Sequence, residues 1–118
     1  MAVTIDFVAF DDERDACLLV LVEQGPWRGP LEEHLRTLQG KLYDYLEAAL
    51  DGSVAARFPK AANKKVIVRL DCYDLPTDEV DGFMKDFADG IRGLPDYSAS
   101  SSPWVRSFEF EVNHDHIH

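Results

Sequence analysis

The segment Gly29–Leu50, GPLEEHLRTLQGKLYDYLEAAL, is the longest periodic stretch of this 118-residue chain. Apolar residues recur in it at steps of three and four, which places them on one face of an α-helix. Pro30 suits the first turn, because its ring presets φ and its missing N–H would be unpaired there. Gly52 follows the last apolar position and is well placed to end the helix in the left-handed conformation. The segment predicts an amphipathic helix whose apolar face consists of Leu31, Leu35, Leu38, Leu42, Leu46, Ala49 and Leu50.

Gly40 interrupts this pattern near its middle. A glycine inside a helix costs about 1 kcal/mol relative to alanine. Simple tolerance and close packing against a neighbouring element both explain it, and neither requires a function.

Four other segments have the composition and alternation of β-strands. The second of them is apolar on both faces, which is typical of a central strand. A charged turn, Asp11–Asp15, joins it to the first, so these two predict a β-hairpin. The four predicted strands are Val3–Phe10, Cys17–Val22, Lys65–Tyr73 and Trp104–Val112.

A second amphipathic helix is predicted after Pro76. Thr77 is a natural N-cap, and the acidic Asp78 and Glu79 suit the positive end of the helix dipole. The helix is expected to end near Gly90 or Gly93, before Pro95. Its apolar face consists of Val80, Phe83, Met84, Phe87, Ala88 and Ile91.

The order of these segments is β-β-α-β-α-β. A hairpin followed by two helical crossovers predicts an α+β fold of two layers, in which two helices cover one face of a four-stranded mixed sheet. The second face is then either a dimerisation surface or an amphipathic face in water. We expect on it the apolar Val8, Phe10, Ile67 and Val105, diluted by Thr4, Asp6, Arg69, Asp71 and Glu109.

The length predicts one domain, residues 1–113, followed by a histidine-rich tail, residues 114–118. No apolar run approaches the roughly 20 residues that a membrane helix needs. The N-terminus lacks the pattern of a signal peptide. The expected location is therefore the cytoplasm.

The net charge is −10, from 22 acidic and 12 basic side chains. Nucleic acids and anionic membranes bind through lysine and arginine, so this balance excludes both as partners. It favours a protein partner, either a basic protein or a second copy of the chain. The alternative is that the charge serves solubility alone.

The middle of the chain carries a recurring set of residues: a tryptophan in a loop, a leucine-rich helix, and a Phe-Pro step before a strand. This set resembles a family of small bacterial proteins known only as a domain of unknown function. The resemblance covers between a third and half of the chain and implies no activity. Its residues are Trp27, His34, Leu35, Leu38, Gln39, Lys41, Leu42, Tyr45, Leu46, Phe58 and Pro59.

The two cysteines, Cys17 and Cys72, both fall in predicted strands and form no CxxC motif. In a reducing cytosol they are expected to be small buried apolar residues.

The tail offers three histidines, His114, His116 and His118, beside Asp115. If the last strand continued through the tail, the histidines would share one face. Imidazoles and a carboxylate so placed could hold Zn or Ni. Against this hypothesis, a chain terminus lacks the supporting shell that a metal site needs.

Trp27 and His34 are the candidate partner-binding residues. A tryptophan in a Gly/Pro loop is either an anchor for a partner or a lid over the sheet edge. His34 is expected to pack against the indole and fix the loop. Five carboxylates near strand ends are a further candidate for metal or acid–base chemistry: Glu23, Asp71, Asp74, Asp78 and Glu79.

Two hypotheses of function follow. The leading one is a non-enzymatic module for protein association, working either as a homodimer or as an immunity-like inhibitor of a basic partner. The alternative is a metal-binding protein or small metal-dependent enzyme that uses the tail histidines or the acidic cluster. No catalytic residue is assigned, because no nucleophile motif, nucleotide loop or paired-cysteine knuckle is present in the sequence.

Overall fold

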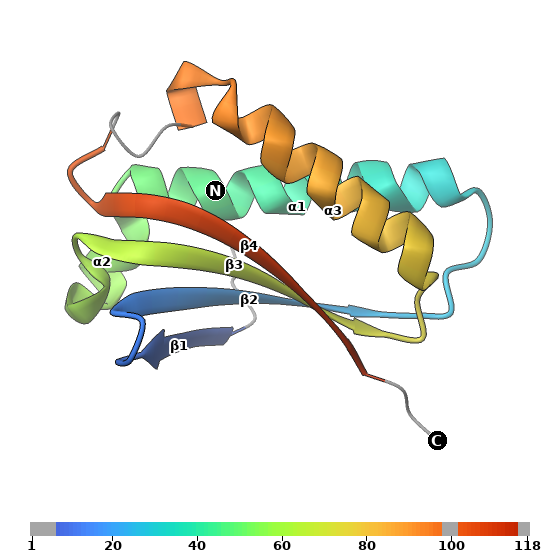
Figure 1. Cartoon of the computed structure of the whole chain (residues 1–118), viewed down its shortest axis with the longest axis horizontal. Helices are drawn as coiled ribbons and strands as arrows, with labels where there is room; N and C mark the ends of the chain where they lie inside the picture. The colour runs from blue at the N-terminus through green and yellow to red at the C-terminus, as the bar shows by residue number, and fades with distance from the viewer. Residues whose placement is uncertain (1–6, 98–101, 116–118) are drawn as a thin grey trace.

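The computed structural model describes residues 7–97 and 102–115 (Figure 1). It confirms the α+β class and the order β-β-α-β-α-β, and it adds three short helices in the connections. The elements are β1 (Phe7–Asp11), β2 (Ala16–Gln24), α1 (Leu31–Leu50), α2 (Ser53–Arg57), η1 (Pro59–Ala61), β3 (Lys64–Tyr73), α3 (Thr77–Arg92), η2 (Pro95–Tyr97) and β4 (Val105–Asp115).

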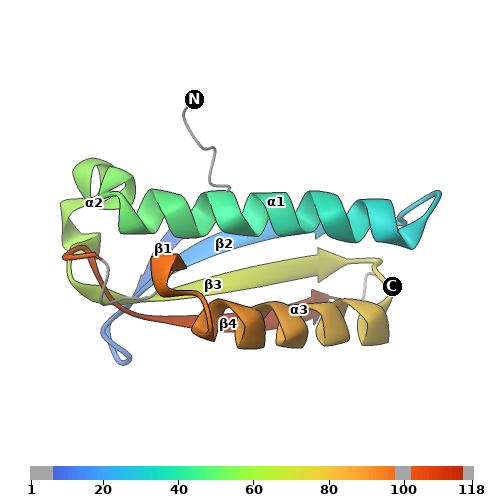
Figure 2. The ribbon, with the colours of Figure 1, turned by 90° about the horizontal axis from the view of Figure 1, so that it is seen from above.

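The four strands form one mixed sheet in the order β1-β2-β3-β4. β1 and β2 are antiparallel, while β2, β3 and β4 are parallel. Parallel neighbours need a crossover connection, and α1 and α3 provide the two crossovers. Both helices lie on the same side of the sheet (Figure 1). Figure 2 shows α1 above β2 and α3 above β4.

The main core lies between the two helices and the sheet. Leu38, Leu42 and Leu46 of α1 are at most 1% exposed, as the leucine spacing predicts. Phe87 of α3 contacts Phe110 of β4 edge-on, with ring centroids 5.6 Å apart, and Tyr43 of α1 at 5.2 Å. These aromatic contacts join both helices to the last strand.

The start of α3 differs from the prediction by one residue. Thr77 is the first helical residue and Pro76 occupies the cap position, and no side chain in the described part of the chain caps the helix. Asp78 and Glu79 lie in the first turn as predicted, where their charges favour the positive end of the dipole.

Three of the apolar residues predicted on the second face of the sheet lie on the helix side instead. Val8 is opposite Leu19, and Phe10 is opposite Cys17, and both partners belong to the main core. Residues opposite each other share a face, so Val8 and Phe10 also point toward the helices. Val105 is buried in the same core.

A register irregularity explains why Val105 departs from the prediction. Lys64 pairs with Val105 and Lys65 with Ser107, so Arg106 is an extra residue at the start of β4. A bulge of this kind reverses the alternation on one side of it. Of the other residues predicted for this face, Thr4 and Asp6 lie outside the described residues.

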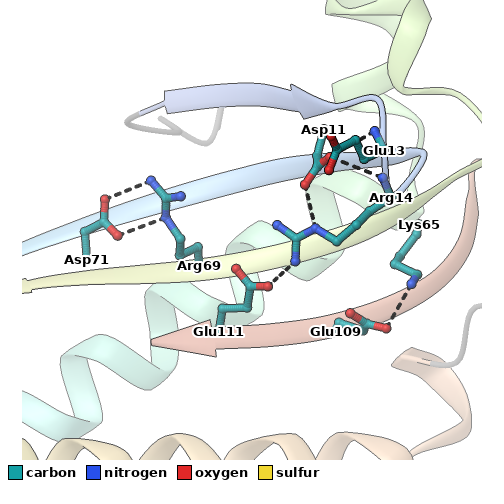
Figure 3. Close-up of polar contacts among 8 residues, drawn as sticks. All are labelled: Asp11, Glu13, Arg14, Lys65, Arg69, Asp71, Glu109 and Glu111. Atoms are coloured by element: carbon teal, nitrogen blue, oxygen red, sulfur yellow. Dashed lines mark hydrogen bonds and ion pairs between the residues drawn. The ribbon is translucent and has the colours of Figure 1, made fainter. Parts of the chain in front are cut away.

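The face of the sheet turned away from the helices carries a small second core. Leu18 and Val20 of β2 and Ile67 of β3 are 5%, 1% and 0% exposed. Figure 3 shows charged side chains on this face, with Arg14 reaching from the β1–β2 turn to Glu111 on β4. The prediction that Ile67, Arg69, Asp71 and Glu109 lie on one face is consistent with this register.

Three sets of ion pairs make up this charged layer, which we call the ion-pair layer. Arg14 bonds Asp11 at 2.6 Å and also Glu111, Lys65 bonds Glu109 at 3.0 Å, and Arg69 bonds Asp71 at 2.9 and 3.2 Å. Hydrogen bonds from Arg14 hold the pKa of Asp11 below its ordinary value. Long arginine and lysine stems cover apolar surface while their charged ends stay in water.

Gly52 has φ of +88°, which confirms the left-handed end predicted for the first helix. A methyl group there would lie 2.7 Å from Trp104 Nε1. We expect Gly52→Ala to lower the free energy of unfolding by about 2 kcal/mol, because a side chain strains the left-handed backbone and displaces the indole. Urea denaturation measures this loss, and a wild-type midpoint would contradict it.

A candidate binding pocket at the carboxyl ends of the parallel strands

Two neighbouring parallel strands end at the same edge of the sheet. β2 ends at Gln24 and β3 at Tyr73, and their last residues are paired. The loops that follow lead into α1 and α3, whose first turns lie at this edge (Figures 1 and 2). This is the edge at which ligands commonly bind in α/β proteins.

Gly25 ties the two loops together. Its N–H donates to the carbonyl of Tyr73 at 2.7 Å. A methyl group at Gly25 would lie 2.0 Å from the carbonyl oxygen of Asp74, a distance that no side chain can occupy. Asp74 itself has φ of +60°, which an aspartate tolerates better than most residues. The close approach requires glycine at position 25 and fixes the Asp74 turn beside it.

Trp27 stacks on His34 of α1, with ring centroids 5.1 Å apart and planes 3° apart. His34 Nε2 lies 2.5 Å from the carbonyl oxygen of Arg28, so this nitrogen carries the proton and donates it. The expected contact between the histidine and the indole is therefore confirmed. It holds Trp27 half-buried against the edge of the main core.

A pocket of about 450 Å³ lies between the two loops and the first turns of the helices. Its walls are mostly apolar, from Pro26, Trp27, Gly29, Leu31, Leu75 and Pro76, and its acidic groups are Asp74 and Glu79. Within residues 7–97 and 102–115, neither carboxylate takes part in an ion pair or a side-chain hydrogen bond. Apolar walls with two available carboxylates suit a group that is cationic at one end and apolar along its stem.

The other predicted acidic residues do not join this pocket. Asp71 is 8% exposed and pairs with Arg69 on the opposite face of the sheet. Glu23 pairs with Lys41 of α1 at 2.7 Å. In the part of the chain that the structure describes, no group of three histidine, cysteine or acidic residues could hold a metal ion. The predicted cluster is therefore divided between several surfaces.

His114 lies in β4, which continues to Asp115. Its Nε2 is 2.7 Å from Asp81 Oδ1 of α3, so the imidazole joins the last strand to that helix. His116 and His118 lie outside the described residues. The three-histidine metal site stays a prediction.

Cys17 and Cys72 are free thiols, 0% and 1% exposed, in the main core. Burial raises the pKa of Cys17 from 9.0 to about 11 and that of Cys72 to about 12, helped by the nearby carboxylate of Asp81. As the pH rises above 9, the two thiols therefore ionise in the unfolded chain before they ionise in the folded protein. The stability that these thiols contribute is complete below pH 9 and is lost toward pH 11 to 12.

We expect both thiols to resist a disulfide reagent at pH 8 while the protein is folded, and to react at once in denaturant. Burial keeps the reagent out and keeps the sulfurs protonated. Release of the coloured thiolate from Ellman's reagent measures this. Rapid reaction of either cysteine in the native protein would contradict the packing described for β2 and β3.

None of the helices in the described ranges, 7–97 and 102–115, is long and apolar enough to cross a membrane. A model for a family of unknown function (DUF6572) matches residues 2–94. The match includes both pocket loops and all of the pocket lining, and it ends before β4. No curated protein matches the chain, and no solved structure does.

Proposed function

The chain belongs to a family of unknown function (DUF6572), and we propose that it is a non-enzymatic protein-association module that recognises a basic partner. The observation that carries the proposal is the pocket of Trp27, Leu75, Asp74 and Glu79. It combines an aromatic wall with two carboxylates that have no ion-pair partner in the described chain. A lysine or arginine side chain of a partner fits this combination.

The chemistry of such a side chain matches the pocket at both ends. Its methylene stem can lie along Leu75 and the indole of Trp27. Its charged end can pair with Asp74 or Glu79, and the face of the indole attracts the same cation. The stacked His34 holds the indole in position before a partner arrives, which reduces the loss of side-chain freedom on binding.

The net charge of −10 supports a basic partner over a second copy. Opposite charge raises the rate of encounter, whereas two copies of this chain repel each other at long range. The lining also supports binding over nucleophilic catalysis, because the residues described in it supply no serine, cysteine or histidine side chain. Inhibition of a basic protein, as immunity proteins do, is one role of such a module.

The test is calorimetric titration of a hexa-arginine peptide into the protein. We expect Asp74→Asn combined with Glu79→Gln to weaken binding about tenfold, because charge-assisted pairing is lost. Asparagine tolerates the positive φ at position 74, so the loop is kept. Glu13→Gln combined with Asp86→Asn removes the same charge from exposed positions outside the pocket.

Comparison of the two double variants distinguishes binding at the pocket from attraction to the overall negative charge. Equal weakening in both would mean that the peptide binds the acidic surface as a whole, and the pocket proposal would be wrong. Sedimentation velocity at tens of micromolar addresses self-association. A stable dimer there would favour a second copy as the partner.

A further inference from the structure

The outer edge of β4 is a long open strand edge. β4 has 11 residues, ends the strand order, and pairs on one side with β3. The strand at the opposite end, β1, has only 5 residues in the described chain. A long edge offers unpaired N–H and C=O groups to a further strand, and proteins commonly block such edges with lysine, proline or a bulge. β4 contains no lysine or proline, and its bulge lies at its beginning.

An apolar groove of about 250 Å³ runs beside this edge, between α3 and β4. Met84 and Ala88 of α3 form its apolar upper wall, and Phe110 and Val112 of β4 form its floor. The charged Asp81 and Lys85 of α3 complete the lining. Figure 2 shows that α3 lies over β4 along the outer side of the sheet. Side chains of an added strand that point toward the helices would enter this groove, because alternate residues of neighbouring strands share a face.

The other face of β4 is acidic. Glu109 and Glu111 have side chains 49% and 34% exposed, and they belong to the ion-pair layer (Figure 3). Lys65 and Arg14 each bond Oε1 of their glutamate, and among the described residues Oε2 of each accepts no hydrogen bond. A carboxylate accepts bonds at both oxygens. A basic side chain on an added strand could therefore pair with either glutamate without displacing its present partner.

We propose that the outer edge of β4 accepts an extended segment of a basic partner, in which apolar residues alternate with lysine or arginine. The apolar residues fill the groove under α3, and the basic residues pair with Glu109 and Glu111. The added strand extends the sheet by main-chain hydrogen bonds. This edge is separate from the loop pocket, so the inference does not depend on the role proposed for Trp27.

A second copy of the chain meets like charges at this edge in the three symmetric registers centred on Glu109, Phe110 and Glu111. Symmetric antiparallel pairing of two β4 strands about Phe110 sets Glu109 of one copy against Glu111 of the other. Pairing about either glutamate sets that residue against itself. Like charges directly opposite each other destabilise a strand pair, and each copy also carries a net charge of −10.

The test uses the full chain and a nine-residue amidated peptide of alternating lysine and valine as the probe. Hydrogen exchange followed by mass spectrometry shows where the peptide binds. We expect slower exchange over Val105–Asp115 when the peptide is present, and no change over Phe7–Asp11. Fluorescence anisotropy of the labelled peptide gives the affinity of each variant.

Two variants probe the two faces of the strand. Glu109→Lys combined with Glu111→Lys should weaken binding about tenfold, because attraction becomes repulsion. Asp44→Lys combined with Asp86→Lys makes the same change of charge at exposed positions on the two helices, away from the edge, and should weaken binding much less. Ala88→Arg leaves the ion-pair layer intact and fills the groove from α3, and it should weaken binding by a similar factor to the first pair.

Three results would overturn the inference. One is slowed exchange confined to segments other than β4. Another is an equal loss of affinity in the two lysine double variants, which would show attraction to the overall charge. The third is a protein that is already dimeric without peptide and exchanges slowly along β4, since a second copy would then occupy the edge.

Discussion

Gly25→Ala is expected to lower the free energy of unfolding by about 3 kcal/mol, a large effect for a single methyl group. The added carbon would lie 2.0 Å from the carbonyl oxygen of Asp74, which is backbone and cannot rotate away. The two loops must therefore separate, and the hydrogen bond from Gly25 to Tyr73 is lost with them. Separation of the loops also widens the pocket between them, so the variant should bind hexa-arginine more weakly. Urea denaturation followed by circular dichroism measures the stability change.

Gly40→Ala is the matched control, since it adds the same methyl group to a helix. Among the residues that the structure describes, a side chain at Gly40 would meet no atom within 4 Å apart from the backbone of its own helix. We expect the free energy of unfolding to rise by about 1 kcal/mol, because alanine favours the helix and restricts the unfolded chain. The two variants should thus move the urea midpoint in opposite directions. If both variants were less stable than the wild type, the loss in Gly25→Ala could not be assigned to the contact with Asp74.

The same open space decides between the two explanations that the sequence leaves for Gly40. Within residues 7–97 and 102–115 no element packs closely against Gly40, which favours simple tolerance of the glycine. More generally, both long helices could be predicted, because their apolar positions repeat over four turns or more and Leu38 and Phe87 are buried as that repeat requires. Periodicity over such lengths is the strongest local signal of structure.

The second face of the sheet could be predicted only in part. The alternation within β3 correctly puts Ile67, Arg69 and Asp71 together. It fails for Val105, because a bulge is set by pairing with another strand and not by local composition. The alternation within β1 also gives the wrong side for Val8 and Phe10. β1 is apolar on both sides, so its sequence alone does not say which side faces the helices.

The candidate pocket was partly visible in the sequence. Trp27 stood out as a large apolar residue in a Gly/Pro loop, and Asp74 and Glu79 as acids after a strand. The contribution of Leu75 could not be predicted, because Leu75 follows β3 and joins Trp27 in one pocket only when the two loops meet. Leu31 was predicted only as part of the apolar face of the first helix. The signal that could have found them is the repeated arrangement of a strand, a proline-containing loop and a helix at both crossovers.

Leu42→Ala is expected to lower the free energy of unfolding by about 3 kcal/mol, through lost burial and the cavity left behind. Leu42 is 0% exposed, and it lies midway along the face by which α1 covers the sheet. Alanine is the better helix former, so helix propensity opposes the loss and cannot account for it.

Leu94→Ala is the control for this substitution, because Leu94 is 40% exposed and follows the end of α3. The same three carbons are removed there without leaving a cavity, so we expect a change within about 0.5 kcal/mol. Urea denaturation of both variants gives the comparison, with an unchanged slope for each if the folded and unfolded states keep their exposed surfaces. Equal losses of stability in the two variants would mean that the leucine face of α1 is not packed against the sheet. The pocket would then lose its support, since Leu31 and His34 are held in place by the same helix.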